Sequence, residues 1–470
     1  MTEKINDLSD QKWQCQFWQK NDENRRIYGE LRYSLARGLE IEAIGQVDPS
    51  IFEHTRTLYG SSVELGKFTL FGCTSVGWAQ SPDAVRIELS ACYMIIGVHV
   101  AKDEVKKCIF TINQLSEFCR TSMERKGLTS FEHQILRGRF RGLKFWLGQD
   151  YSDVEMVNTE RISDGFIISS NLSDEDAHNV LRRIDSVVAE ILEEDKSIFL
   201  FKKKEARFLI TLESESPPGI HQLHQAVYAV SSLLSIVMLR KCIPIHLTLF
   251  LSPQTPEQEE ESGIIDYQML ISHYLNRHEE LQVRNSSFDP FRDISAKDLA
   301  LCFDQTLMAW EELLETPLNL PLSVIKQYIR GEYNPAQYIA LCISALEEWF
   351  SNYETHSKPK EKYDFMLNKY STRWMIEKLD DYLPYEPTEK GRGELLSKVR
   401  AQVLHPSGKK GVPLKEGRSL DEATILNISE VLTLVLLRAL YSRLGLSAHV
   451  IEQFGGEQRP VLQEHFFIIE

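Results

Sequence analysis

Hydrophobic and polar positions follow two different patterns along this chain, one before about residue 290 and one after it. In the first part, short apolar runs are separated by Gly, Pro and Asp, for example at Gly45 and Asp48-Pro49. The runs typical of strands are 30–44, 67–73, 85–97, 205–212 and 243–251, with a further apolar segment at 108–118. Residues 220–241 predict one long and very apolar helix. We therefore expect a β-rich or α+β domain over residues 1–290.

The second part has the periodicity of amphipathic helices, with apolar residues three and four positions apart. Helices are expected at 296–315, 321–330, 334–350, 363–383, 388–404 and 421–444. Pro317 ends the first of them, and Gly445 is the expected C-terminal cap of the last. The polar stretch 285–295 is the best linker candidate. The predicted fold class is α+β, with an all-α helical bundle over residues 296–470.

Composition narrows the class of protein. A length of 470 residues fits two or three domains, and a net charge of −15 argues against a large non-specific nucleic-acid surface. The eight cysteines form no CxxC pair and have no zinc-type spacing with histidines, so we expect buried thiols in a reducing compartment. The polar N-terminus has no apolar signal core, and no apolar run of about 18 residues is present. These features predict a cytoplasmic protein without a membrane segment.

The segment 395–408, LLSKVRAQVLHPSG, carries the strongest candidate chemistry. It places Arg400 and His405 near the end of a helix, with Pro406 and Gly408 as stop signals. A His can move the proton of an RNA 2′-hydroxyl and an Arg can neutralise the charge that develops on the phosphate, without a metal or other cofactor. Chance pairs of this kind are expected among 13 histidines, and Arg240–His246 and Arg443–His449 are two of them. Structural roles for Arg400 and His405, as a surface cation and a helix-terminal His, are the alternative.

Other polar residues are weaker candidates. Glu347 and Glu348 are adjacent, so on a helix their side chains point about 100° apart and at most one faces a shared cleft. Lys409 and Lys410 could steer phosphate or simply solubilise a loop. On a strand, Arg137, Arg139 and Arg141 would share one face that could contact RNA, although a solvated strand face explains them too. His221 and His224 have metal-ligand spacing but no third ligand nearby, so no metal site is expected.

Three stretches of the second half resemble the HEPN superfamily, specifically ApeA-like HEPN domains. They are 339–350 (IALCISALEEWF), the Arg-x4-His segment within 396–408, and 434–454, a Leu-rich helix ending in Leu-Gly. The first half is similar to the domain that precedes HEPN in ApeA-type anti-phage proteins, over 65–72, 135–148 and 207–238. The order of these short stretches, which together span most of the chain, makes the resemblance more specific than each one alone.

This resemblance implies a metal-independent endoribonuclease that acts in abortive infection, with no cofactor. Arg400 and His405 correspond to the catalytic Arg and His, and Glu347 to an acidic residue that orients them. In such domains two protomers pair around one composite cleft, which implies a homodimer or a higher homo-oligomer. The implied partners are an RNA substrate, with tRNA as a candidate, and a phage-derived protein trigger. Many active relatives have a polar residue after the Arg, whereas this chain has Ala401.

Two other functions stay open from the sequence. A non-catalytic helical dimerisation module attached to a sensor is favoured weakly by Ala401. A HEPN partner of a nucleotide-transferring enzyme would need a companion polymerase-like Gly-Ser and paired Asp motif, which this chain lacks. Replacement of His405 separates the first alternative from the nuclease, because only the nuclease needs that imidazole.

Overall fold

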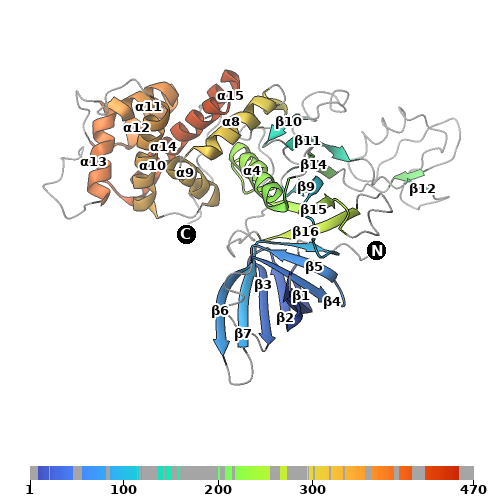
Figure 1. Ribbon diagram of the computed structural model, residues 1–470. Coiled ribbons are helices and arrows are strands. Elements are labelled where there is room, and N and C mark those ends of the chain that lie inside the picture. The colour runs from blue at the N-terminus through green and yellow to red at the C-terminus, as the bar shows by residue number, and fades with distance from the viewer. Residues whose placement is uncertain are drawn as a thin grey trace, which may run out of the picture.

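The fold is taken from a computed structural model (Figure 1). The structure describes residues 9–20, 22–45, 56–80, 85–113, 115, 118, 136–140, 143–150, 156–158, 199–201, 207–213, 218–254, 265–272, 294, 296–299, 302–316, 319–331, 334–354, 361–385, 391–404 and 419–454. The predicted mixed α+β class is confirmed: an antiparallel sheet built largely from the first half is followed by helices.

Fourteen strands form one sheet, and every described strand pair in it is antiparallel. In chain order the strands are β1 (Gln11–Gln19), β2 (Asp22–Ser34), β3 (Gly38–Gly45), β4 (Thr57–Ser62), β5 (Gly66–Phe71), β6 (Thr74–Gln80), β7 (Val85–Ala91), β8 (Tyr93–Ile96), β9 (Val105–Ile112), β10 (Leu136–Phe140), β11 (Leu143–Asp150), β14 (Arg207–Glu213), β15 (Pro244–Leu251) and β16 (Ile265–Ile271). Their order in space is β10-β11-β14-β9-β15-β16-β8-β5-β4-β1-β2-β3-β7-β6. Strands β12 (Met156–Asn158) and β13 (Phe199–Phe201) pair separately.

The strands β1 to β5 and β7 surround a hydrophobic core of their own. In β7, Val85, Ile87, Leu89 and Ala91 are buried while the residues between them are not, as expected for a strand with one solvated face. Trp13, Cys15 and Phe17 of β1 follow the same alternation. The core cluster includes Met94 and Ile96 of β8 and Leu270 of β16, so it extends to the strands that lead into the rest of the sheet.

The remaining strands share a second core with all of the larger helices. Helix α4 (Ile220–Met238) lies between this part of the sheet and the C-terminal helices (Figure 1). Those helices are α7 (Ala296–Leu299), α8 (Phe303–Glu315), α9 (Asn319–Arg330), α10 (Pro335–Tyr353), α11 (Lys362–Tyr370), α12 (Arg373–Tyr382), α13 (Arg392–Leu404), α14 (Glu422–Arg443) and α15 (Ala448–Gln453). The buried cluster runs without interruption from the sheet through α4 into α14.

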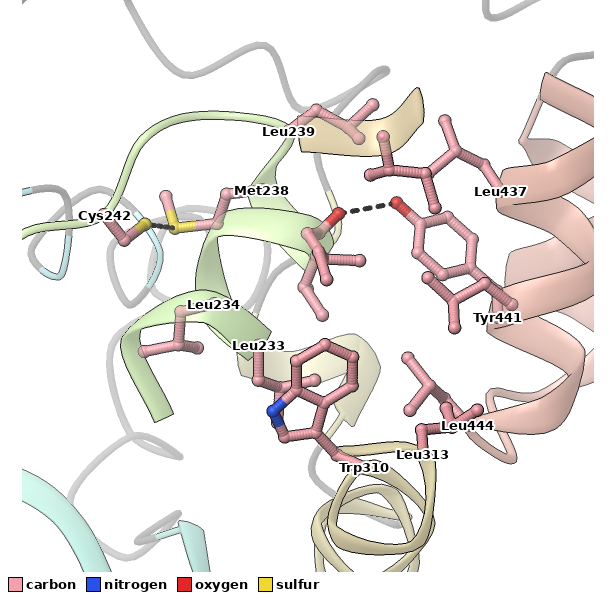
Figure 2. Packing of buried hydrophobic residues seen from close by; sticks show 14 of the residues in the cluster. Leu233, Leu234, Met238, Leu239, Cys242, Trp310, Leu313, Leu437, Tyr441 and Leu444 are labelled. Atoms are coloured by element: carbon pink, nitrogen blue, oxygen red, sulfur yellow. Dashed lines mark hydrogen bonds between the residues drawn. The ribbon is translucent and has the colours of Figure 1, made fainter. Parts of the chain in front are cut away.

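Two side-chain hydrogen bonds fasten α4 to the C-terminal helices. The indole Nε1 of Trp310 on α8 donates to the carbonyl of Ala229 at 2.9 Å, and the Tyr441 hydroxyl on α14 donates to the carbonyl of Ile236 at 2.9 Å. Figure 2 shows the Tyr441 bond amid packed leucines of α4, α8 and α14. Both side chains are almost fully buried, so the two bonds satisfy donors that could not reach water. The assignment of residues 1–290 and 296–470 to separate domains stays a prediction.

Several helix ends follow the local sequence. The Asn334 side chain accepts a hydrogen bond from the Gln337 N–H ahead of Pro335, and Asp421 caps Thr424 in the same way. The C-cap residue of α14 is Leu444, and Gly445 directly after it ends the helix, as predicted. Its φ of +75° and the bond from the Leu446 N–H to the Tyr441 carbonyl make a Schellman motif.

Other predicted elements differ from the structure. The run 85–97 divides at Cys92 into β7 and β8. The main-chain N–H of Cys92 donates to the Phe71 carbonyl, and β7 pairs with β3 whereas β8 pairs with β5. The predicted helix 363–383 is two helices, since the Thr372 side chain caps a new start at α12. Strands β1, β4, β6 and β16 were not predicted.

The 22-residue helix α14 is long and apolar enough to cross a membrane by composition alone, but 78% of its most apolar window is buried inside the fold. Burial of that extent is typical of a core helix, which is uniformly hydrophobic because neighbours cover it on all sides.

Candidate functional site

Arg400 lies next to Glu347 at the place where α13 approaches α10. Its Nη1 atom is 3.1 Å from the Glu347 Oε2 atom, and the two side chains are 33% and 27% exposed. This exposure leaves the pair reachable from solvent. Leu396 and Val399, on the neighbouring turn of α13, are fully buried and fix the face that the helix turns toward the bundle.

Glu347 has two further partners, both at the start of α11. The Lys362 Nζ atom is 2.6 Å from Glu347 Oε1, and the Tyr363 hydroxyl donates to the same oxygen. Burial raises the pKa of the Glu347 carboxyl, but the bonds from Lys362 and Tyr363 and the charges of Lys362 and Arg400 outweigh it, so the net pKa is lowered. Glu347 is therefore an ionised carboxylate shared by two cations and a phenol.

The pKa values of Tyr363 and Arg400, which both contact Glu347, are raised. Burial and the bond to Glu347 both raise the pKa of Tyr363, which keeps the phenol protonated as a donor. Burial lowers the pKa of Arg400, but the Glu347 charge and a hydrogen bond with Tyr363 outweigh it and raise the value. Each group is thus held in the form that binds the others.

A second cluster of the same kind lies seven residues further along both helices. Glu354, at the end of α10, accepts from Lys369 Nζ at 2.7 Å and from the Tyr370 hydroxyl at 2.7 Å. The offset of 15 and 16 residues between partners is identical in the two clusters, so α10 and α11 run in the same direction at this contact. Both clusters fasten α10 to α11, but only the Glu347 cluster also has an Arg from α13.

The start of α13 is seated on α11 beside the Glu347 cluster. The Gly393 N–H donates to Asp364 Oδ1 at 3.0 Å, and Asp364 follows Tyr363 directly. A Cβ atom on Gly393 would lie 2.7 Å from Asp364 Oδ2, and Gly391 has a φ of +85°. Glycine at both positions suits this close approach of the start of α13 to the Asp364 carboxylate.

Several predicted site residues fall outside the described part of the chain. The described part of α13 ends at Leu404, so His405, Lys409 and Lys410 lie outside the described residues. Arg141, between β10 and β11, lies outside them too. Ala401 is exposed on α13. The catalytic roles of Arg400, His405 and Glu347 are not tested by these positions and stay predictions.

The adjacent acid and the basic strand have separate places. Glu348 accepts from the Leu320 N–H at 3.3 Å and so binds the first turn of α9, away from Arg400. This agrees with the expected angle of about 100° between neighbouring side chains on a helix. Arg137 and Arg139 lie on the edge strand β10, whereas Arg141 lies outside the described residues, so the alternation expected over all three stays a prediction. The Arg139 side chain is exposed, while the main-chain N–H of Arg139 donates to Asp304 Oδ1 of α8 at 3.2 Å.

The two histidines on α4 show no metal-binding arrangement. His224 packs against Tyr93 and Tyr228, and burial lowers its pKa to about 4, whereas His221 bonds to Gln225. Across the described ranges, no group of three or more His, Cys, Asp or Glu side chains could hold a metal ion.

Lys362 and Tyr363 were not predicted as part of the site. The signal was present in the sequence, because a Lys-Tyr pair recurs at 362–363 and 369–370 while Glu recurs at 347 and 354. Equal seven-residue spacing in two neighbouring helices would have suggested that they meet side by side. Only the fold shows that Arg400 joins one of the two clusters.

The comparisons with known proteins concern the first half of the chain. Residues 12–300 match the family described as ApeA N-terminal domain 1, which is more than half of the 470 residues. No curated protein and no solved structure matches the chain. The chain belongs to the ApeA family through this N-terminal domain, which places it among ApeA-type anti-phage defence proteins.

Proposed function

We propose that this defence protein is a metal-independent endoribonuclease of the HEPN type, which cuts host RNA when a phage protein activates it. The observation that carries the proposal is the contact of Arg400 with an ionised Glu347 on a partly exposed face of the helical bundle. A cation oriented by a carboxylate is what stabilisation of a phosphorane requires. The resemblance of 339–350, 396–408 and 434–454 to ApeA-like HEPN domains supports the same function.

In the proposed reaction the 2′-oxygen of RNA attacks its own phosphate. The imidazole of one His405 removes the 2′-hydroxyl proton as general base, and an acid delivers a proton to the leaving 5′-oxygen. Arg400 stabilises the charge on the pentacoordinate phosphate. The products are a 2′,3′-cyclic phosphate and a 5′-hydroxyl, so no side-chain nucleophile or cofactor is needed.

A homodimer follows from this chemistry. One chain supplies one His405, and a single imidazole cannot easily act as base and acid in the same step. Two protomers with facing Arg400–His405 segments would supply both groups. Glu347 is proposed as the residue that orients Arg400, with Lys409 and Lys410 as RNA contacts.

We propose that the N-terminal domain senses the phage protein and passes the signal through α4. Helix α4 lies within the ApeA-matched region, yet it is bonded to α8 and α14 of the bundle through Trp310 and Tyr441. A change in the sheet domain that moves α4 would therefore act on helices that support the site. The cytoplasm is the proposed location, since host RNA is there.

The test uses purified wild-type, Arg400→Ala and His405→Ala proteins with total cellular RNA in EDTA, with and without phage lysates. Cleavage by the wild-type protein alone, leaving cyclic-phosphate ends, is the expected result. Cuts that persist in both variants would assign the activity to another site or to a contaminant.

A second candidate is a non-catalytic helical interaction module. Two observations favour it: Ala401 stands where many active relatives have a polar residue, and the Glu347 cluster repeats at Glu354 without an Arg, as a structural fastening does. Under this function the His405→Ala variant would keep both toxicity and partner binding.

A further inference from the structure

Lys362 is the least expected member of the Glu347 cluster. Its Nζ atom lies 2.6 Å from Glu347 Oε1 and 5.2 Å from the centre of the Tyr363 ring. The ammonium group is therefore held by a carboxylate on one side and a ring face on another. Its side chain is 24% exposed, so solvent and solutes can still reach it.

Charge distinguishes the two otherwise equivalent clusters. Lys369 and Glu354 balance each other, with Tyr370 neutral. At Glu347 one carboxylate faces two cations, Lys362 and Arg400, so one positive charge is left unbalanced. In the part of the chain that the structure describes, neither cation has a second carboxylate partner. This positive charge is a local feature of the Glu347 cluster, since the chain as a whole has a net charge of −15.

The geometry of the two cations suits a phosphate. Lys362 and Arg400 approach the two different oxygens of one carboxylate, so their donors converge on neighbouring positions. A phosphodiester also presents two oxygens side by side, and an ammonium and a guanidinium bind such oxygens with charge-assisted hydrogen bonds. His405 follows Arg400 by five residues in the sequence.

We propose that Lys362 is a second phosphate-binding residue of this site, which binds the RNA backbone together with Arg400, and that Tyr363 positions it. This rests on the proposed function for the identity of the ligand as RNA. Lys362 holds the phosphate in the ground state, while Arg400 meets the charge of the transition state. Glu347 keeps both cations at one point.

The test measures binding of a short fluorescein-labelled single-stranded RNA in EDTA, with His405→Ala as the background so that no RNA is cut. The full-length chain carries Lys362→Gln, Lys362→Arg or the matched control Lys369→Gln, and affinity is followed from about 50 to 200 mM KCl. Lys362→Gln should weaken binding about tenfold, as expected for one charged hydrogen bond. It should reduce the slope of log K against log salt by about 0.7, as for one lost phosphate contact. Lys369→Gln should change neither, and Lys362→Arg should keep the slope.

Thermal unfolding of the three variants controls for folding. Lys362→Gln and Lys369→Gln each remove one ion pair between α11 and α10, so their melting temperatures should fall by similar amounts. Equal binding by Lys362→Gln and Lys369→Gln at matched stability would overturn the proposal, as would an unchanged slope in Lys362→Gln. Cleavage assays without the His405 change separate the two ideas. Normal cleavage with normal KM in Lys362→Gln removes Lys362 from the site and leaves the nuclease intact. If the salt slope depends on Lys362 but the protein cleaves no RNA, Lys362 remains an RNA-binding residue and the nuclease function is rejected.

Discussion

The hydroxyl of Tyr441 donates a hydrogen bond of 2.9 Å to the main-chain carbonyl of Ile236, 205 residues earlier in the chain. This buried bond joins the ApeA-matched region to the longest helix of the bundle. It is one of the points in the described part of the chain where a signal from the sheet domain could act on the bundle through hydrogen bonds rather than apolar packing.

Tyr441→Phe removes this bond without creating a cavity. The Ile236 carbonyl is then left in an apolar environment, so we expect the free energy of unfolding to fall by about 1–3 kcal/mol. Urea denaturation measures the loss. Tyr382→Phe is the control, because Tyr382 is only partly buried and carries no bond to α4. A stability of Tyr441→Phe equal to that of the wild type would show that the bond is not made in solution.

Glu347→Gln and Glu354→Gln separate orientation of Arg400 from fastening of the helices. Both changes weaken a bond between α10 and α11, so both should lower the melting temperature. Only Glu347→Gln loses the ion pair with Arg400, and we expect RNA cleavage to fall about 10- to 100-fold, as for a charged hydrogen bond worth roughly 1.5–3 kcal/mol. Parallel cleavage and melting assays provide the comparison. Equal activity of the two variants would make Glu347 a fastening alone.

Gly393→Ala tests the seat of α13 on α11. The new Cβ would lie 2.7 Å from Asp364 Oδ2 and 3.2 Å from the Cβ of Tyr363, so either the Asp364 carboxylate, which accepts from the Gly393 N–H, or the helix start must move. We expect a loss of about 1–3 kcal/mol and weaker cleavage, because Arg400 moves with α13. Gly77→Ala is the matched control, since its nearest new neighbour is the Glu88 carboxylate at 3.9 Å. If the two variants unfold at the same denaturant concentration, the close approach at Gly393 is wrong.

Glu430 predicts a dependence of stability on pH. It is buried on α14, its Oε1 atom has no hydrogen-bond partner among the described residues, and burial raises its pKa to about 9. Between the unfolded pKa of about 4.3 and this value, the unfolded chain releases a proton that the folded chain keeps. The contribution of Glu430 to stability therefore falls as pH rises through that window.

Glu430→Gln removes this titration. We expect the variant to gain stability relative to the wild type at pH 8, and to gain less or none at pH 5, where both states of the wild type hold more of their protons. Urea denaturation at the two pH values gives the difference. A gain that is the same at both pH values would mean that Glu430 titrates normally in the fold.

Local sequence determined the features that depend on neighbours in the chain. Asn334, Asp421 and Gly445 mark helix ends because capping needs only residues within one turn. Helix α4 and strand β15 were predicted from their continuous apolar runs. Strand β1 could have been, since Trp13, Cys15 and Phe17 alternate with polar residues in a segment that we interpreted only as polar.

Tertiary structure decided which of these elements meet. Arg400 and Glu347 were selected from the sequence by resemblance, but their contact, and the presence of Lys362 and Tyr363 on the same carboxylate, depend on how α10, α11 and α13 pack. The sheet order and the bonds of α4 to Trp310 and Tyr441 likewise join residues far apart in the chain. Periodicity shows which face of an element is buried, whereas the partner of that face is set by packing of the whole core.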